Sequence, residues 1–218
     1  MHAEADRLWM INHQIRPWNV FDDRVLHALQ TVRREQFVPE AFRAMAFADT
    51  ALPLPHGQAM LRPPIEGRLL AGLDAQPDDA ALLIGTGSGY VAGVLAQLAG
   101  TVTAVDIHAD LTSAAEQCLA KAGIHNVSLV TGAYQEFTPA QGFDRILVSG
   151  ALPCLDERLP DWLNDGGTLL ITTGEAPCMH VEKLVRRDGR NEHSVLFETV
   201  LPPLEAPRLR AQTSDFRF

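Results

Sequence analysis

The spacing of hydrophobic residues changes along this chain, from a helical region to a region of alternating strands and helices. Residues 22–36 are predicted to form a helix capped by Asp22, because apolar residues recur there every three or four positions. The positions expected to face the core are Val25, Leu26, Leu29 and Val32. Residues 49–64 are rich in proline, which predicts a loop, and residues 65–73 return to the helical pattern.

From residue 80 onward, short apolar runs alternate with amphipathic stretches. The runs predicted to be buried strands are Ala80–Ile84, Val102–Ile107, Val127–Val130, Asp144–Ser149 and Thr168–Thr173. A helix containing Leu159 and Leu163 is expected before the last of them. The runs 179–187 and 195–201, separated by a turn sequence, are typical of a hairpin. This order predicts an α/β fold with a parallel sheet and helices on both faces.

Composition narrows the class of protein. The chain has 218 residues, a net charge of −9 and an acidic pI, which argue against a nucleic-acid or anionic-membrane partner. Its three cysteines have no CxxC spacing, so we expect no disulfide framework, no zinc site and a reducing cytoplasmic location. The N-terminus has no apolar signal region, and no window is apolar enough for a membrane span.

The strongest chemical signal is a glycine-rich turn at residues 85–90, between a predicted strand and a predicted helix. Glycines allow close approach of a ligand, and the start of the helix offers free N–H groups. Tyr90 stands where a dinucleotide site requires its third glycine, which disfavours NAD and FAD. Asp106, at the end of the second predicted strand, could accept hydrogen bonds from both ribose hydroxyls of an adenosyl group. The alternative is a turn that only tightens a strand–helix corner.

Several further segments, in this order, resemble the protein-L-isoaspartate O-methyltransferase family over nearly the whole chain. They are Arg24–Leu29, Gln36–Glu40, Ala46–Asp49, Leu52–Leu54, His56–Gln58, Ile84–Tyr90, Asn126-Val127, Phe143-Asp144 and Gly166-Gly167. The resemblance implies a Rossmann-like S-adenosylmethionine-dependent methyltransferase fold. Its sheet would have seven strands, mostly parallel with one antiparallel strand, after a helical N-terminal segment. It also implies a repair enzyme that methylates the α-carboxylate of isoaspartyl residues.

Three positions depart from the family pattern. Leu61 stands where the family has a serine that touches the reacting carboxyl. Leu83 replaces an acidic residue that helps to hold the methionine end of the cofactor, and Ala133 replaces an aspartate that accepts from the adenine amino group. A carboxylate nucleophile is already ionised near neutral pH, so the missing serine removes orientation and not a proton transfer.

The candidate site follows from the turn and from the resemblance. The expected cofactor-binding residues are Gly85, Thr86, Gly87, Ser88, Gly89, Tyr90, Asp106, Ile107, Gly132 and Ala133. The candidate substrate-binding residues are His56, Gln58, Leu61 and Arg62, and no residue is assigned as catalytic or as a metal ligand. Arg62 is hypothesised to grip an acidic substrate in place of the missing hydroxyl. The alternatives are a surface arginine at 62 and a partly exposed loop histidine at 56.

These observations predict a helical segment with a covering loop over residues 1–75 and a cofactor-binding core over residues 76–218. The leading hypothesis is a methyltransferase of the isoaspartyl-repair type that acts on an isoaspartyl peptide or protein. A second is a catalytically impaired member that binds cofactor or a protein partner. A third is a methyltransferase with a different acidic acceptor. The oligomeric state is left open, with a monomer favoured.

Overall fold

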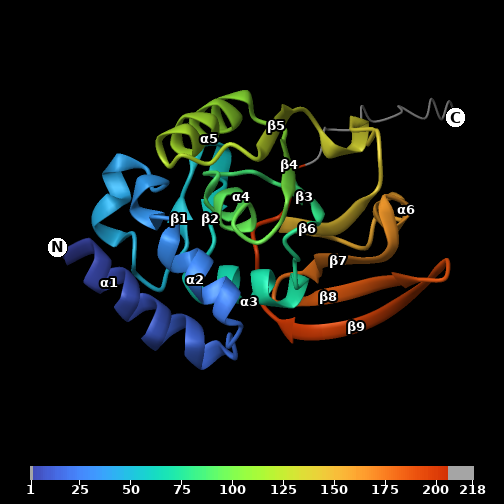
Figure 1. The fold of residues 1–218 in the computed structure, drawn as a ribbon, viewed down its shortest axis with the longest axis horizontal. Coiled ribbons are helices and arrows are strands. Elements are labelled where there is room, and N and C mark those ends of the chain that lie inside the picture. Colours follow the sequence, from blue (N-terminus) through green and yellow to red (C-terminus); the bar gives the residue numbers. More distant parts are fainter. Residues whose placement is uncertain (1, 206–218) are drawn as a thin grey trace, which may run out of the picture.

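The computed structural model, which describes residues 2–205, is built on a seven-stranded sheet with the order β5-β4-β3-β6-β7-β8-β9 (Figure 1). The strands are β3 Ala80–Ile84, β4 Thr101–Asp106, β5 Val127–Thr131, β6 Phe143–Leu152, β7 Leu163–Glu175, β8 Cys178–Arg187 and β9 Arg190–Glu198. Strand β8 is antiparallel to both neighbours, and the other pairings are parallel. A mostly parallel sheet with one antiparallel strand is therefore confirmed.

Helices fill the N-terminal part and the strand connections. They are α1 His2–Met10, α2 Asp23–Thr31, α3 Pro63–Leu73, α4 Tyr90–Leu95, α5 Ala109–Lys121 and α6 Arg158–Asp161. A π-helical turn, Ile11–Ile15, continues α1, and a small hairpin of β1 Leu52–Pro53 and β2 Ala59–Met60 lies in the proline-rich segment. Among the described residues, no helix combines the length and apolar character needed to cross a bilayer.

Successive residues of the central strands face opposite sides of the sheet and feed two hydrophobic clusters. Leu83 and Leu147 join the cluster that also contains the buried residues of the N-terminal helices. Their neighbours Leu82 and Ile146 join the second cluster. That second face is covered by short elements, a 3₁₀ turn at Tyr134–Glu136 and the four-residue α6, which ends before Leu163 although the predicted helix included that residue. The first cluster contains residues from both sides of the predicted division at residue 75.

Several predicted boundaries shift for identifiable reasons. The helix at residues 22–36 ends at Thr31, although Asp22 caps it as expected by accepting from the backbone N–H of Arg24. The next helix begins two residues before residue 65, because prolines are tolerated in the first turn of a helix. Leu163 lies in β7 and not in a helix, and β9 begins and ends earlier than the predicted run 195–201.

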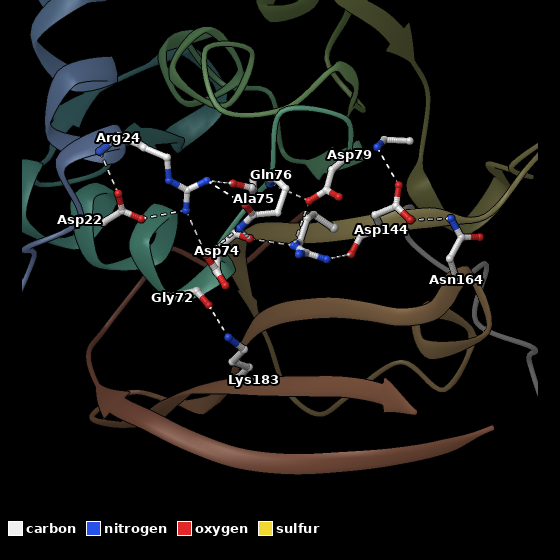
Figure 2. Close-up of polar contacts among 12 residues, drawn as sticks. Asp22, Arg24, Gly72, Asp74, Ala75, Gln76, Asp79, Asp144, Asn164 and Lys183 are labelled. Atoms are coloured by element: carbon white, nitrogen blue, oxygen red, sulfur yellow. Dashed lines mark hydrogen bonds and ion pairs between the residues drawn. The ribbon is translucent and has the colours of Figure 1, made fainter. Parts of the chain in front are cut away.

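A polar network ties the helices to the amino ends of the central strands, at the opposite end of the sheet from the glycine turn (Figure 2). Arg24 of α2 donates to the backbone carbonyl of Ala75 at 2.9 Å and to the carboxylate of Asp74 at 3.1 Å. Asp144 of β6 accepts from the backbone N–H of Ala80 at 2.9 Å. These contacts join α2 to the segment that precedes β3, and the start of β6 to the start of β3.

Candidate cofactor and substrate pocket

The glycine turn between β3 and α4 is held in left-handed conformations that favour glycine. The φ angles of Gly85, Gly87 and Gly89 are 90°, 53° and 83°. A Cβ at Gly89 would lie 2.8 Å from the Cβ of Ala115, so the missing side chain lets α5 approach the start of α4. The turn therefore serves helix packing at Gly89, whatever its other glycines bind.

Four of the six amides in the turn are already hydrogen-bonded within the protein. Gly85 N–H donates to Val105 O at 2.8 Å, and Gly87 N–H donates to the Asp106 carboxylate at 2.9 Å. The Gly89 and Tyr90 amides donate to groups inside the turn. Within residues 2–205, the backbone amides of Thr86 and Ser88 make no hydrogen bond, and the buried Thr86 hydroxyl also has no partner. Fewer amides are available to a ligand than the motif alone suggested.

Asp106, at the carboxyl end of β4, is 7% exposed and lines the pocket. One carboxylate oxygen accepts from Gly87 N–H, and the other accepts from His108 N–H at 3.0 Å. An ionised carboxylate has about four acceptor sites, so two backbone donors leave capacity for two more. The carboxylate is thus fixed in orientation and still able to accept from a diol.

A pocket lies between the glycine turn, the ends of β4 and β6, and the proline-rich segment of residues 49–64, which is the covering loop. Of the predicted site residues, seven line it: Gln58, Leu61, Gly85, Gly87, Asp106, Ile107 and Gly132. The remaining predicted residues are not among its lining residues. Tyr90, in particular, is 1% exposed and packs edge-on against Phe37 in the core.

The pocket also contains residues that the sequence did not single out. Ser149, a half-buried residue within β6, donates to the backbone carbonyls of Ile84 and Gly85 at 3.1 and 2.6 Å. Tyr134 donates to Asp156 at 3.2 Å, and burial together with the nearby Asp156 charge raises the pKa of the phenol to about 12. Its place as the last residue of a predicted strand was the signal available for Ser149.

The segment Pro202–Glu205 returns from β9 to the same pocket. It runs beside the end of β6, where Ala151 N–H donates to Pro202 O and Leu204 N–H donates to Ala151 O, both at 2.8 Å. A Cβ at Gly85 would lie 3.2 Å from a methyl group of Leu204. This contact joins segments over one hundred residues apart, and nothing in the local sequence indicated it.

A buried ion pair anchors the covering loop. Arg34 is fully buried, pairs with Glu66 of α3, and donates to the backbone carbonyls of Ala46 and Leu61 at 2.9 and 2.8 Å. Burial raises the pKa of Glu66 above its ordinary value, although the charge of Arg34 acts in the opposite direction. Arg34 thereby holds the segment before the loop and the pocket residue Leu61 to one helix.

The hypothesis that Arg62 grips an acidic substrate is not supported by its contacts. Its guanidinium donates to both oxygens of Asp49, at 2.9 and 2.8 Å, and this hydrogen bonding raises the pKa of Arg62. The same guanidinium lies 5.5 Å from the centre of the Trp18 ring. The pair joins the two ends of the proline-rich loop, so a substrate carboxylate would first have to displace Asp49.

The three departures from the family pattern have different surroundings. Leu83 is fully buried in the sheet and Ala133 is 7% exposed, and neither lines the pocket. Leu61, 6% exposed, does line it. His56, at the tip of the loop with φ of 60°, lies outside the lining and stacks on His108. Of the three departures, only Leu61 therefore changes the surface of the pocket itself.

Comparison with known proteins agrees with this architecture. The sequence profile of the family described as protein-L-isoaspartate(D-aspartate) O-methyltransferase (PCMT) matches residues 7–205. A protein-L-isoaspartate O-methyltransferase from Methanoculleus marisnigri is 36% identical over 203 residues, covering 93% of this chain and 92% of that protein. One from Photorhabdus laumondii is 37% identical over 188 residues, covering 86% and 89%.

A solved structure gives the same result for the fold. A Plasmodium falciparum protein assigned as a protein-L-isoaspartate O-methyltransferase, in complex with S-adenosyl-L-homocysteine, superposes with a TM-score of 0.79. The match covers 91% of this chain and 98% of that chain, with 20% sequence identity. From the profile match, the identities and the shared fold, this chain belongs to the protein-L-isoaspartate(D-aspartate) O-methyltransferase family.

Proposed function

We propose that this protein is an S-adenosylmethionine-dependent O-methyltransferase that methylates the α-carboxylate of isoaspartyl residues in peptides and proteins. Family membership and the names of its relatives support the reaction and the acceptor. The observation that carries the proposal is the fixed Asp106 carboxylate beside the glycine turn, in a pocket at the carboxyl ends of β3, β4 and β6. Ligands of open α/β sheets bind at this edge.

The residues present fit an adenosyl cofactor on three structural grounds. The Asp106 carboxylate has acceptor capacity left for the two ribose hydroxyls, and the amides of Thr86 and Ser88 make no hydrogen bond within the described part of the chain. Gly132 has a φ of 155° with no neighbour within 4 Å of a built Cβ, so the backbone there is open to a ligand. When bound, the cofactor supplies a methyl group on a sulfonium.

The chain's own contribution to the reaction is orientation. A carboxylate acceptor needs no general base near neutral pH, because it is already ionised. Leu61 and Gln58 lie on the side of the covering loop that lines the pocket, and Arg34 fixes the Leu61 backbone. Positioning of two reactants in line is the main source of rate in such a displacement. Gln58 offers the amide group for holding an acceptor on this side of the pocket.

A second candidate function is favoured by one specific observation. Leu61 places a hydrocarbon side chain in the pocket where the family has a hydroxyl, and Arg62 is already paired with Asp49. The acceptor would then have weaker orientation than in other family members. This observation supports a member that binds cofactor and transfers methyl groups slowly, or one that takes a different acidic acceptor.

Two measurements on the full chain test the proposal. Calorimetry with S-adenosylhomocysteine tests the pocket, and a radiolabelled methyl assay with an isoaspartyl peptide tests transfer. Binding with base-labile methylation of that peptide, absent with the matching aspartyl peptide, is the expected result. Leu61→Ser should raise the transfer rate, by up to about 100-fold if orientation is what the native residue lacks. Leu61→Ala is the matched control, since it removes bulk without adding a hydroxyl. Binding without transfer in all three proteins would exclude the isoaspartyl reaction.

A further inference from the structure

Two histidines and an aspartate from two segments of the chain meet at the outer edge of the pocket. His56 comes from the tip of the covering loop, His108 follows β4, and Asp110 lies in the first turn of α5. One ligand-type atom from each lies within 4.8 Å of the other two. Among the described residues, no other group of three histidine, cysteine or acidic side chains meets this criterion.

The contacts inside this cluster are close and specific. Nε2 of His56 lies 2.9 Å from both carboxylate oxygens of Asp110. The two imidazole rings stack with centroids 3.9 Å apart and planes within 4°. Nε2 of His108 lies 2.9 Å from a carboxylate oxygen of Glu205, in the segment that returns to the pocket. Three segments of the chain therefore meet at two imidazoles and two carboxylates: the tip of the loop, the start of α5 and the returning segment.

The two carboxylates of this cluster are not neutralised by a lysine or an arginine of the described residues. Neither Asp110 nor Glu205 forms a salt bridge with a lysine or an arginine within residues 2–205; their ion-pair partners are the two histidines. With neutral imidazoles, the cluster carries two negative charges and two nitrogen lone pairs. A divalent cation would neutralise both carboxylates and use both nitrogens.

We propose that His56, His108 and Asp110, with Glu205 as a fourth ligand, form a binding site for a divalent transition-metal ion of the zinc type. Imidazole and carboxylate ligands suit Zn²⁺, Co²⁺ and Ni²⁺, whereas Mg²⁺ and Ca²⁺ prefer oxygen ligands alone. The proposal uses no cysteine and does not depend on the methyl-transfer function. The cysteine spacing and the separation of the ligands in sequence offered no sign of it.

The geometry requires a small rearrangement to bind an ion. Neighbouring ligands of a tetrahedral ion lie about 3.4 Å apart when each metal–ligand distance is about 2.1 Å. Histidine nitrogens bind metals in the plane of the ring, so the parallel rings must tilt apart. The side chain of His56 is 42% exposed, which leaves its ring free to turn. A bound ion would join the covering loop to α5 and to the returning segment across the pocket edge.

The test is metal titration of the full chain after removal of metals with a chelator. Calorimetry with Zn²⁺ and the visible absorption of Co²⁺ should both show one site per chain, with no comparable binding of Mg²⁺. His56→Ala, His108→Ala and Asp110→Asn should each weaken Zn²⁺ binding roughly tenfold or more, because each removes a ligand. His13→Ala, which removes an exposed histidine elsewhere, should have no effect.

A second readout follows the structural consequence. Zn²⁺ should slow amide hydrogen exchange in residues 52–60 of the wild-type chain and leave that exchange unchanged in His56→Ala. Circular dichroism of each variant checks that it is folded. The proposal is overturned if the wild-type chain binds neither Zn²⁺ nor Co²⁺ at millimolar ion. It is equally overturned if folded His56→Ala and Asp110→Asn bind Zn²⁺ as tightly as the wild type.

Discussion

The buried pair of Arg34 and Glu66 allows a quantitative prediction about the covering loop. Arg34→Met leaves Glu66 in a site where its side chain is only 2% exposed, with no opposite charge, and removes the donors to the Ala46 and Leu61 carbonyls. Breaking a buried pair on one side typically costs about 3–5 kcal/mol of unfolding free energy. We expect a loss in this range, a large part of the about 5–15 kcal/mol that stabilises a typical domain.

The free energy of protonating Glu66 sets an independent upper limit on the stability lost when this buried carboxylate has no partner. Without Arg34, the carboxyl can escape its buried charge by binding a proton. At pH 7 this costs about 1.4 kcal/mol for each unit above an ordinary glutamate pKa near 4.3, or about 3.7 kcal/mol. This ceiling lies within the range expected from broken buried pairs, so both routes give the same magnitude.

The same reasoning predicts a pH dependence with a definite sign. Burial raises the pKa of Glu66 in the folded state, and Arg34→Met removes the charge that opposes this rise. A group with a raised folded-state pKa stabilises below its unfolded pKa and loses that contribution as the pH rises. The stability deficit of Arg34→Met relative to wild type should therefore shrink between pH 7 and pH 5, by up to about 1.4 kcal/mol per pH unit.

Urea unfolding of four proteins measures these effects. Arg34→Met and Glu66→Met should each be strongly destabilised, and the double variant should cost about as much as one single variant, because neither charge is left alone. Arg33→Met, at the exposed neighbouring position, should change stability by less than about 0.5 kcal/mol. Additive single effects, or a cost of Arg34→Met below about 1 kcal/mol, would refute the argument.

Three further predictions concern the turn, the carboxylate and the far end of the sheet. Asp106→Asn should weaken S-adenosylhomocysteine binding, measured by calorimetry, roughly 10- to 100-fold, because one charge-assisted hydrogen bond is worth about 1.5–3 kcal/mol. Unchanged affinity would show that this residue does not contact the cofactor. In thermal unfolding, Gly89→Ala should destabilise the fold by more than Gly123→Ala does. Both glycines have a positive φ, but only a Cβ at residue 89 would meet Ala115. Equal losses of stability would contradict the packing argument. Arg24→Ala should lower the free energy of urea unfolding by about 1 kcal/mol and leave S-adenosylhomocysteine affinity unchanged, since the contacts of Arg24 lie at the amino ends of the strands. Weaker binding would show that this end of the sheet is coupled to the pocket.

Local sequence determined the central strands, most of the helices and their order. The alternation of apolar runs with amphipathic stretches predicted the central strands, and the turn at residues 85–90 followed by Asp106 predicted one edge of the pocket. These features depend on spacing within a few residues, which the linear pattern records directly. Some details differed: prolines begin α3 and do not break it, and Leu163 lies in β7 although a helix was predicted there.

Contacts between distant segments were decided by the tertiary structure. Arg34 meets Glu66, Arg62 meets Asp49, and the returning segment brings Leu204 against Gly85, although no pattern in the sequence links these positions. A charged or apolar side chain has no partner until the sheet is assembled, so its role follows from which elements pack together. For that reason, the residues that could bind a ligand were partly readable in the sequence, whereas those that hold the pocket in shape were not.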